Sequence, residues 1–181
     1  MDLVKALRRR IKDGVERRKV RRTFEKYVSP GVIALIEKDP KKYFDTKPKN
    51  THFQFVAVLL DDQSESISER WGAVGDIIFD HGAWISHMTP CLVVACFGGV
   101  FPESDTDANR LKLVDALVAS VGKEIRLAHG ECDGLMGNFG SSRRFSYGVH
   151  IPGFLGLLKK LLESPPGTAM EFAPEKQNRV Q

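Results

Sequence analysis

The spacing of apolar residues along this chain switches repeatedly between a strand pattern and a helix pattern, and the order of the switches limits the possible folds. Two apolar runs, FQFVAVLL from Phe53 and CLVVACF from Cys91, indicate buried strands. Apolar residues three or four apart indicate amphipathic helices. The expected helices span residues 66–82, 107–122 and 154–164, and the expected strands span residues 53–62, 83–89 and 91–99, with a Gly-rich hairpin within residues 124–150.

This order predicts an α+β domain with a ferredoxin-like βαββαβ core that is extended by a hairpin and a helix. Residues 45–52 are polar and are expected to form a connector before the first strand. The predicted organisation is a basic amphipathic helix in residues 1–26, a folded domain in residues 27–166, and a tail in residues 167–181 that stays loose or adds an edge strand.

Most of the positive charge of the chain lies at its N-terminus. Residues 1–26 contain eleven Lys or Arg and four Asp or Glu, a net charge of +7, whereas the whole chain has +4. The helix predicted there has one narrow apolar stripe, which favours a coiled coil or another partner helix. Packing against the chain's own domain, or binding of nucleic acid or an anionic membrane, are the other interpretations.

The remaining composition is that of a chain expected in the cytoplasm. Its longest apolar runs are shorter than the roughly 20 residues that span a bilayer, and no secretory signal is recognised at the N-terminus. The three cysteines are odd in number and lack CxxC spacing, which indicates reduced thiols rather than a disulfide framework or a zinc site.

Several motifs resemble the class III nucleotide cyclase domain of adenylate and guanylate cyclases. They are YVSP, VAVLLDD, IIFDHGA, PCLVVACFG and GECDGLMGNFGSS, in this order. The resemblance runs from about Phe24 to Glu163. It implies the cyclase fold, in which the predicted hairpin and final helix extend the βαββαβ core.

The resemblance also implies a metal site, but only half of it is present. In the family, two metal ions held by carboxylates on neighbouring strands assist the ribose 3′-hydroxyl in displacing pyrophosphate. The first carboxylate corresponds to Asp62, and the second to Cys91, whose soft thiol is a poor ligand for Mg²⁺. Structural roles are the alternative: Asp62 as the end of a strand, and Cys91 and Cys96 as small buried residues.

The other positions that the resemblance assigns to nucleotide binding and catalysis are also changed. The base-reading lysine corresponds to His87, and the second base-reading position to Gly148, which has no side chain. The asparagine that orients the ribose corresponds to Leu155. Lys159 replaces the arginine that contacts the phosphates, which keeps the charge but loses the planar fork. Glu65 replaces a glycine of the phosphate-holding turn.

The Gly-rich hairpin is expected to lie in a dimer interface. Met136 and Phe139 are predicted to be exposed on this hairpin, where apolar side chains are unfavourable without a covering surface. The resemblance implies that the hairpin reaches the partner subunit. We therefore expect a homodimer, or a heterodimer with another cyclase domain.

These observations favour a catalytically degenerate cyclase-homology domain that acts as a dimerising signalling module and needs no cofactor. The alternative is an atypical adenylate or guanylate cyclase that uses Asp61 and Asp62 with magnesium or manganese, although adjacent strand residues point to opposite faces. Nucleic-acid or membrane binding through residues 1–26 is the least favoured hypothesis. Whether a nucleotide still binds is left open.

Overall fold

We analysed a computed structural model of the chain, which describes residues 47–60, 67–99, 105–139 and 147–173. The predicted N-terminal helix, the YVSP motif and the tail after residue 173 lie outside the described residues. The acidic residues Asp61, Asp62 and Glu65 also lie outside them. None of the described helices is long and apolar enough to cross a membrane.

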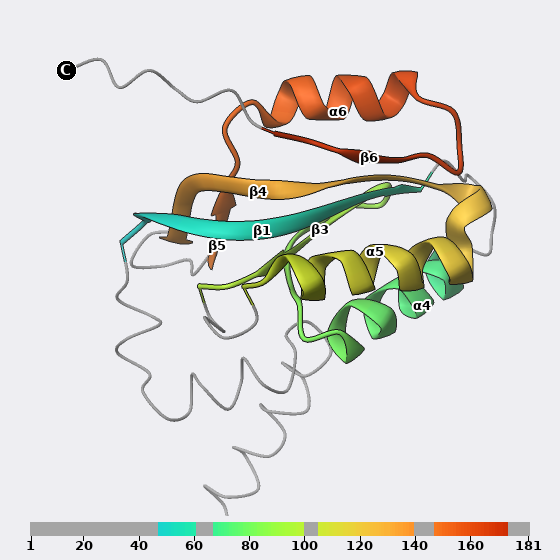
Figure 1. Cartoon of the computed structure of the whole chain (residues 1–181), viewed down its shortest axis with the longest axis horizontal. Helices are drawn as coiled ribbons and strands as arrows, with labels where there is room; N and C mark the ends of the chain where they lie inside the picture. Colours follow the sequence, from blue (N-terminus) through green and yellow to red (C-terminus); the bar gives the residue numbers. More distant parts are fainter. Residues whose placement is uncertain (1–46, 61–66, 100–104, 140–146, 174–181) are drawn as a thin grey trace, which may run out of the picture. The chain divides into compact units, whose positions relative to one another are not determined.

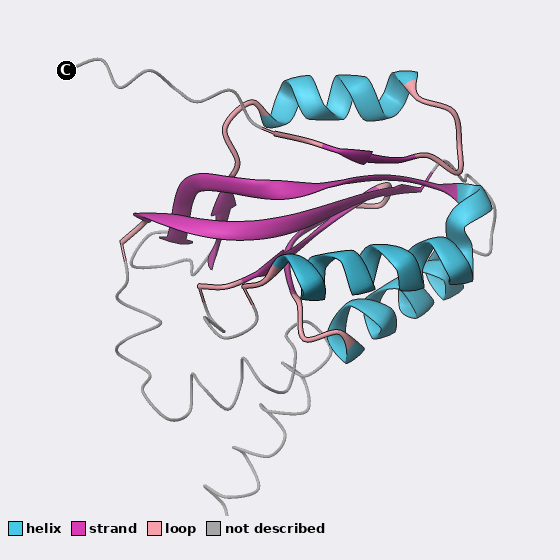
Figure 2. Cartoon of the chain, in the orientation of Figure 1, coloured by secondary structure: helices cyan, strands magenta, loops and turns pink. Residues whose placement is uncertain are grey.

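Within the described residues, six strands form one mixed sheet (Figures 1 and 2). The strand order is β2-β3-β1-β4-β5, all antiparallel, and the short strand β6 runs parallel to β4. The first four strands in this order have the ferredoxin-like arrangement that the sequence predicted. The strands are β1 (Lys49–Leu60), β2 (Trp84–Met88), β3 (Leu92–Phe97), β4 (Ile125–Asn138), β5 (Tyr147–His150) and β6 (Ala169–Glu171).

The described helices lie on both faces of this sheet. The helices α4 (Ile67–Asp80) and α5 (Asp107–Val121) cover one face, and α6 (Phe154–Glu163) lies over the other face, beside β6 (Figure 1). A single 3₁₀ turn, Gly122–Glu124, joins α5 to β4. The positions of the three helices agree with the periodicity of the sequence.

Strand β1 is the centre of the core because it is buried on both faces from Phe53 to Leu60. Val56, Val58 and Leu60 pack against α4 and α5. Since side chains alternate along a strand, Phe53 and Phe55 lie on the opposite face, toward α6. The solid apolar run in the sequence therefore marks a strand with a hydrophobic layer on each side.

The start of β1 differs from the sequence prediction. Residues 49–52 were expected in a polar connector, but they form the first part of β1 and pair with residues 133–136 of β4. Their polarity follows from exposure, since Lys49, Asn50 and His52 face solvent. Pairing with the long strand β4 decides the conformation here, and local composition does not. Of the two alternatives left open for the tail, its described part contains a short strand, β6, which pairs with β4.

Replacing Leu117 with alanine tests the packing of α5. Leu117 is a residue of α5 whose side chain is fully buried in the core. Leu117→Ala is therefore expected to lower the free energy of unfolding by about 2–5 kcal/mol, measured by urea denaturation. Leu111→Ala, at a site on the same helix that is 45% exposed, is expected to change it by no more than about 0.5 kcal/mol. Equal effects of the two variants would contradict the orientation of α5.

Candidate functional site

Two of the positions that the sequence singled out, His87 and Leu155, lie on the walls of one cavity. The cavity has a volume of about 460 Å³ and lies between β2, β5 and the start of α6. Its walls are mostly apolar. The lining residues are Ser86, His87, Val94, Val149, His150, Ile151, Gly153, Phe154 and Leu155.

The cavity exists because β5 lies close to β2, although the two strands are at opposite ends of the strand order. Strand β4 curves strongly toward its C-terminal end in Figure 1, which carries β5 back across the sheet. The Val149 amide then donates a hydrogen bond of 3.1 Å to the Ser86 hydroxyl oxygen. An irregular register between Ile85 and His87 marks a bulge at this point of β2.

The close approach of β5 to β4 requires a glycine. A side chain at Gly134 would overlap the carbonyl oxygen of His150 and press on the ring of Phe53. The Gly-rich sequence of this segment therefore serves the pairing of β4 with β5 as well as a turn. No phosphate-binding loop is needed to explain these glycines.

Gly148 and Lys159 do not line the cavity, although both are close to it in the sequence. Gly148 is next to the lining residue Val149 and has an ordinary backbone conformation. A Cβ at this position would lie 3.6 Å from the nearest atoms, so packing does not require glycine there. Lys159 is exposed on α6 and forms an ion pair of 3.8 Å with Glu163.

Cys91 lies beside the end of β1, as the resemblance to the cyclase domain implied. Its carbonyl oxygen accepts a hydrogen bond of 3.0 Å from the Leu60 amide, the last residue of β1. The side chain of Thr89 accepts hydrogen bonds from the amides of Cys91 and Leu92 and so fixes this turn. The structure thus places position 91 next to the point where the chain continues toward Asp62.

The predicted burial of Cys91 is wrong, whereas that of Cys96 is correct. Cys91 is exposed because it precedes β3 and lies in the turn, where its sulfur is 3.7 Å from the Thr89 hydroxyl. Cys96 and Cys132 are buried in the sheet. Burial raises the pKa of the Cys132 thiol to about 12 and the pKa of Cys96 well above its ordinary value.

The predicted exposure of Met136 is also wrong. Met136 is only 4% exposed, and its sulfur fills the space beside Gly99, where a Cβ would overlap it. The curvature of β4 turns this side chain into the domain, which the sequence did not reveal. Phe139, at the end of β4, is 44% exposed as predicted. The proposed interface therefore depends on Phe139, and a polar residue at position 136 would disrupt the core instead.

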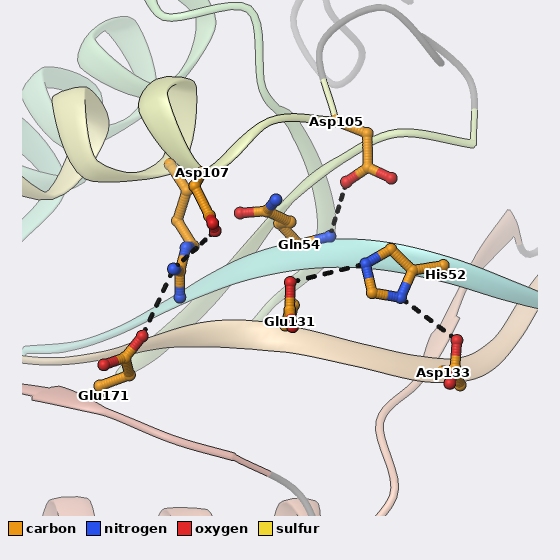
Figure 3. Close-up of polar contacts among 8 residues, drawn as sticks. His52, Gln54, Asp105, Asp107, Glu131, Asp133 and Glu171 are labelled. Atoms are coloured by element: carbon orange, nitrogen blue, oxygen red, sulfur yellow. Dashed lines mark hydrogen bonds and ion pairs between the residues drawn. The ribbon is translucent and has the colours of Figure 1, made fainter.

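A group of charged residues lies on the α5 side of β1 and β4, beyond the start of α5 (Figure 3). The ring of His52 is 3.2 Å from Asp133 and 3.7 Å from Glu131. Asp105 accepts a hydrogen bond of 3.1 Å from the Gln54 amide, and partial burial raises its pKa. Within the described ranges, no group of three or more His, Cys, Asp or Glu side chains has an arrangement that would hold a metal ion.

Sequence reasoning missed Ser86 and the apolar walls at Val149, Ile151 and Phe154. Ser86 is one polar residue in a strand of ordinary composition, so nothing in the local sequence marks it. Its hydrogen bond with the Val149 amide of β5 joins residues that are 63 positions apart. The Gly-rich character of residues 130–140 was the available signal that β4 bends. It did not specify which strand β5 would meet.

Comparison with solved structures identifies the fold. The guanylyl cyclase Cya2 matches with a TM-score of 0.54 and 15% identity over 69% of this chain and 77% of its own. The guanylate cyclase domain of RhGC from Catenaria anguillulae, in complex with GTP, matches with a TM-score of 0.55 and 10% identity over 69% and 80%. A bacterial light-regulated adenylyl cyclase matches with a TM-score of 0.58 and 14% identity over 89% and 52%.

The chain therefore has the mixed α+β fold of class III nucleotide cyclases, with structural similarity to their catalytic domains. No protein-family model and no curated protein sequence matches the chain. Identities of 10–15% establish the shared fold, and the chemistry of the site has to be argued from the residues of this chain.

The different burial of the cysteines predicts their reactivity. At pH 8 an aromatic disulfide such as Ellman's reagent is expected to modify one thiol per folded chain rapidly, because Cys91 is exposed. Cys96 and Cys132 are expected to react slowly, since burial shields them and their raised pKa values keep them protonated. The change Cys91→Ser should remove the fast reaction, and a fast phase that persists in this variant would contradict the structure around position 91.

Proposed function

We propose that this chain is a catalytically degenerate nucleotide cyclase homology domain that acts in the cytoplasm as a dimerising signalling module. The observation that carries this proposal is the position of Leu155. Its side chain lines the cavity and is 83% exposed, and the resemblance to cyclases assigns this position to the group that orients the ribose. An aliphatic side chain donates and accepts no hydrogen bonds.

The metal-binding half of the site supports the same conclusion. Catalysis of phosphoryl transfer with two metal ions needs several anionic oxygen ligands around the phosphates. Position 91, beside the end of β1, supplies a thiol in place of a carboxylate. Soft sulfur ligands favour metals other than magnesium, so Asp62 alone would hold the catalytic cation weakly.

Polar side chains are also missing at the positions that the resemblance to cyclases assigns to base reading. His87 is the one residue at these positions with a side chain that forms hydrogen bonds, and Gly148 has none. A site that discriminates between purines through buried hydrogen bonds loses that discrimination when the polar groups are absent. The volume of the cavity, about 460 Å³, is in the range of small-molecule sites, so it leaves room for a nucleotide base that binds without reacting.

An atypical adenylate or guanylate cyclase is the competing function. It would need a second carboxylate near Asp62, and Asp61 is the nearest in sequence. Neighbouring residues of a regular strand point to opposite faces, so this pair requires a bulge or a turn at the end of β1. An assay for cyclic product distinguishes the two functions.

The purified chain is expected to form no cyclic nucleotide from ATP or GTP, with either Mg²⁺ or Mn²⁺, above the level of a reaction without protein. The physical reason is the missing second carboxylate together with the apolar residue at position 155. Product is measured by chromatography after prolonged incubation at high protein concentration.

Asp62→Ala is the matched control for this assay. Cyclic product that the wild-type chain makes and Asp62→Ala does not would overturn the proposal and establish the competing one. Product that is equal in both proteins would indicate a contaminating enzyme, which leaves the expected absence of activity in place. Calorimetric titration with ATP and GTP, without turnover, then measures whether the cavity still binds a nucleotide.

Dimer formation is expected to depend on Phe139. Phe139→Asp places a charge in the proposed interface, where its desolvation is unfavourable, and should reduce the mass in solution from two chains to one by light scattering. Leu111→Asp is the matched control, because Leu111 has almost the same exposure and lies on α5. A dimer that survives Phe139→Asp would place the interface elsewhere.

A further inference from the structure

The segment Gly167–Phe172, here called the C-terminal strap, lies along the N-terminal half of β4 and contains β6. In addition to the ladder between β4 and β6, backbone hydrogen bonds of 2.7–2.8 Å hold its ends: Gly167 donates to the Ile125 carbonyl, Leu127 donates to the Thr168 carbonyl, and Phe172 donates to the His129 carbonyl. A strand of three residues with one paired edge is a weak element by itself. Its attachment therefore depends on the side chains around it.

Phe172 ends the strap and packs on both sides. Its ring meets the ring of Phe55 edge to face, with centroids 6.3 Å apart, and the Lys160 ammonium lies 5.9 Å from its centroid. A side chain at Gly130 would overlap the Phe172 carbonyl oxygen, so the strap lies directly against β4 there. Lys160 belongs to α6, so Phe172 connects the strap to the helix whose first turn lines the cavity.

A buried cation lies beside the strap. Arg110 of α5 is only 4% exposed and forms ion pairs of 2.8 Å with Asp107 and 3.4 Å with Glu171 of β6 (Figure 3). Its Nη1 is 3.3 Å from Nδ1 of His129. The Arg110 Nε is buried without a hydrogen-bond partner among the described residues. One N–H group of this cation therefore lacks an acceptor, and a second positive charge beside the buried guanidinium is repelled by it.

The contact between Arg110 and His129 requires a neutral imidazole. A guanidinium nitrogen is only a donor, so Nδ1 of His129 must accept the hydrogen bond with its lone pair. Burial and the Arg110 cation lower the pKa of His129 below its ordinary value, partly offset by Glu171 and Asp115. Arg110 and Asp115 act on the His129 ring from α5, and Glu171 acts on it from β6. Val56, which lies opposite His129 on β1, carries no charge.

We propose that the C-terminal strap is a pH-sensitive latch, bound to β4 while His129 is neutral and loosened when its imidazole takes up a proton. Protonation removes the acceptor for Arg110 and places two cations about 3.3 Å apart. The guanidinium must then move, which weakens its ion pair with Glu171, the side-chain link between α5 and the strap. Phe172 is the next residue of the strap after Glu171, so the loosening is expected to extend to the backbone bond between its amide and the His129 carbonyl.

The direction of the pH dependence follows from the lowered pKa. An unfolded or released chain protonates His129 near its ordinary pKa of 6.5, before the latched state does. The free energy that favours the latched state is therefore largest above about pH 6.5, and it decreases as the pH falls below that value.

Hydrogen exchange measured by mass spectrometry tests the proposal on the full chain at pH 7.5 and pH 5.5, with rates corrected by an unstructured reference peptide. Peptides covering residues 164–173 are expected to lose protection at the lower pH, while peptides of α4 keep theirs. His129→Gln retains a neutral acceptor for Arg110 and should abolish this difference. His52→Gln, at an exposed histidine on the same face, should leave it intact.

Two results would overturn the latch. One is pH-dependent exchange of the strap that persists in His129→Gln. The other is an equal loss of protection in α4, which would mean that the whole domain is destabilised. An NMR titration of the wild-type imidazoles gives a test that does not depend on how the variants fold. The midpoint for His129 must lie below 6.5, and the protection of the strap must fall between pH 6.5 and that midpoint. A His129 midpoint at or above 6.5 would also reject the proposal.

Discussion

The antiparallel ladder between β1 and β4 is the interaction on which the other features depend. It pairs all twelve residues of β1, from Lys49 opposite Met136 to Leu60 opposite Ile125. Because β3 pairs with the other edge of β1, this ladder places β1 in the middle of the sheet, where both faces are covered. The pairing with β3 brings Leu60, at the end of β1, beside Cys91.

The free edge of β4 is divided between two partners, and this division organises the rest of the domain. Its first half binds the C-terminal strap, and its last residues pair with β5. The helix α6 connects these two partners in the chain, with its first turn at the cavity and Lys160 over Phe172. Glycines at positions 130 and 134 permit both close approaches, since a side chain at either would overlap a backbone carbonyl. The cavity and the strap are thus attached to one strand and one helix.

The sequence predicted the order of the elements and the buried strands, because apolar periodicity is a local property and the order of elements restricts the topology. The fold family was indicated by the resemblance of several motifs. Sequence reasoning failed where a residue's environment depends on distant segments. Met136 was expected on the surface because the hairpin sequence is rich in glycine, but the curvature of β4 turns it inward against Gly99. Cys91 was expected inside because it precedes an apolar run, but the Thr89 turn leaves it exposed. The cavity could not be predicted at all, since the Ser86–Val149 bond joins opposite ends of the strand order.

The packing around Gly148 determines which substitutions the domain accepts at this position. Its backbone is in an ordinary conformation, and a Cβ added there would have its nearest neighbours 3.6 Å away, so alanine fits at this position without rearrangement. Glycine is required at positions 130 and 134, by contrast, because a Cβ at either position would overlap a backbone carbonyl oxygen. Gly148 can therefore be replaced by alanine through a single codon change without strain, whereas a side chain at position 130 or 134 would overlap a backbone oxygen.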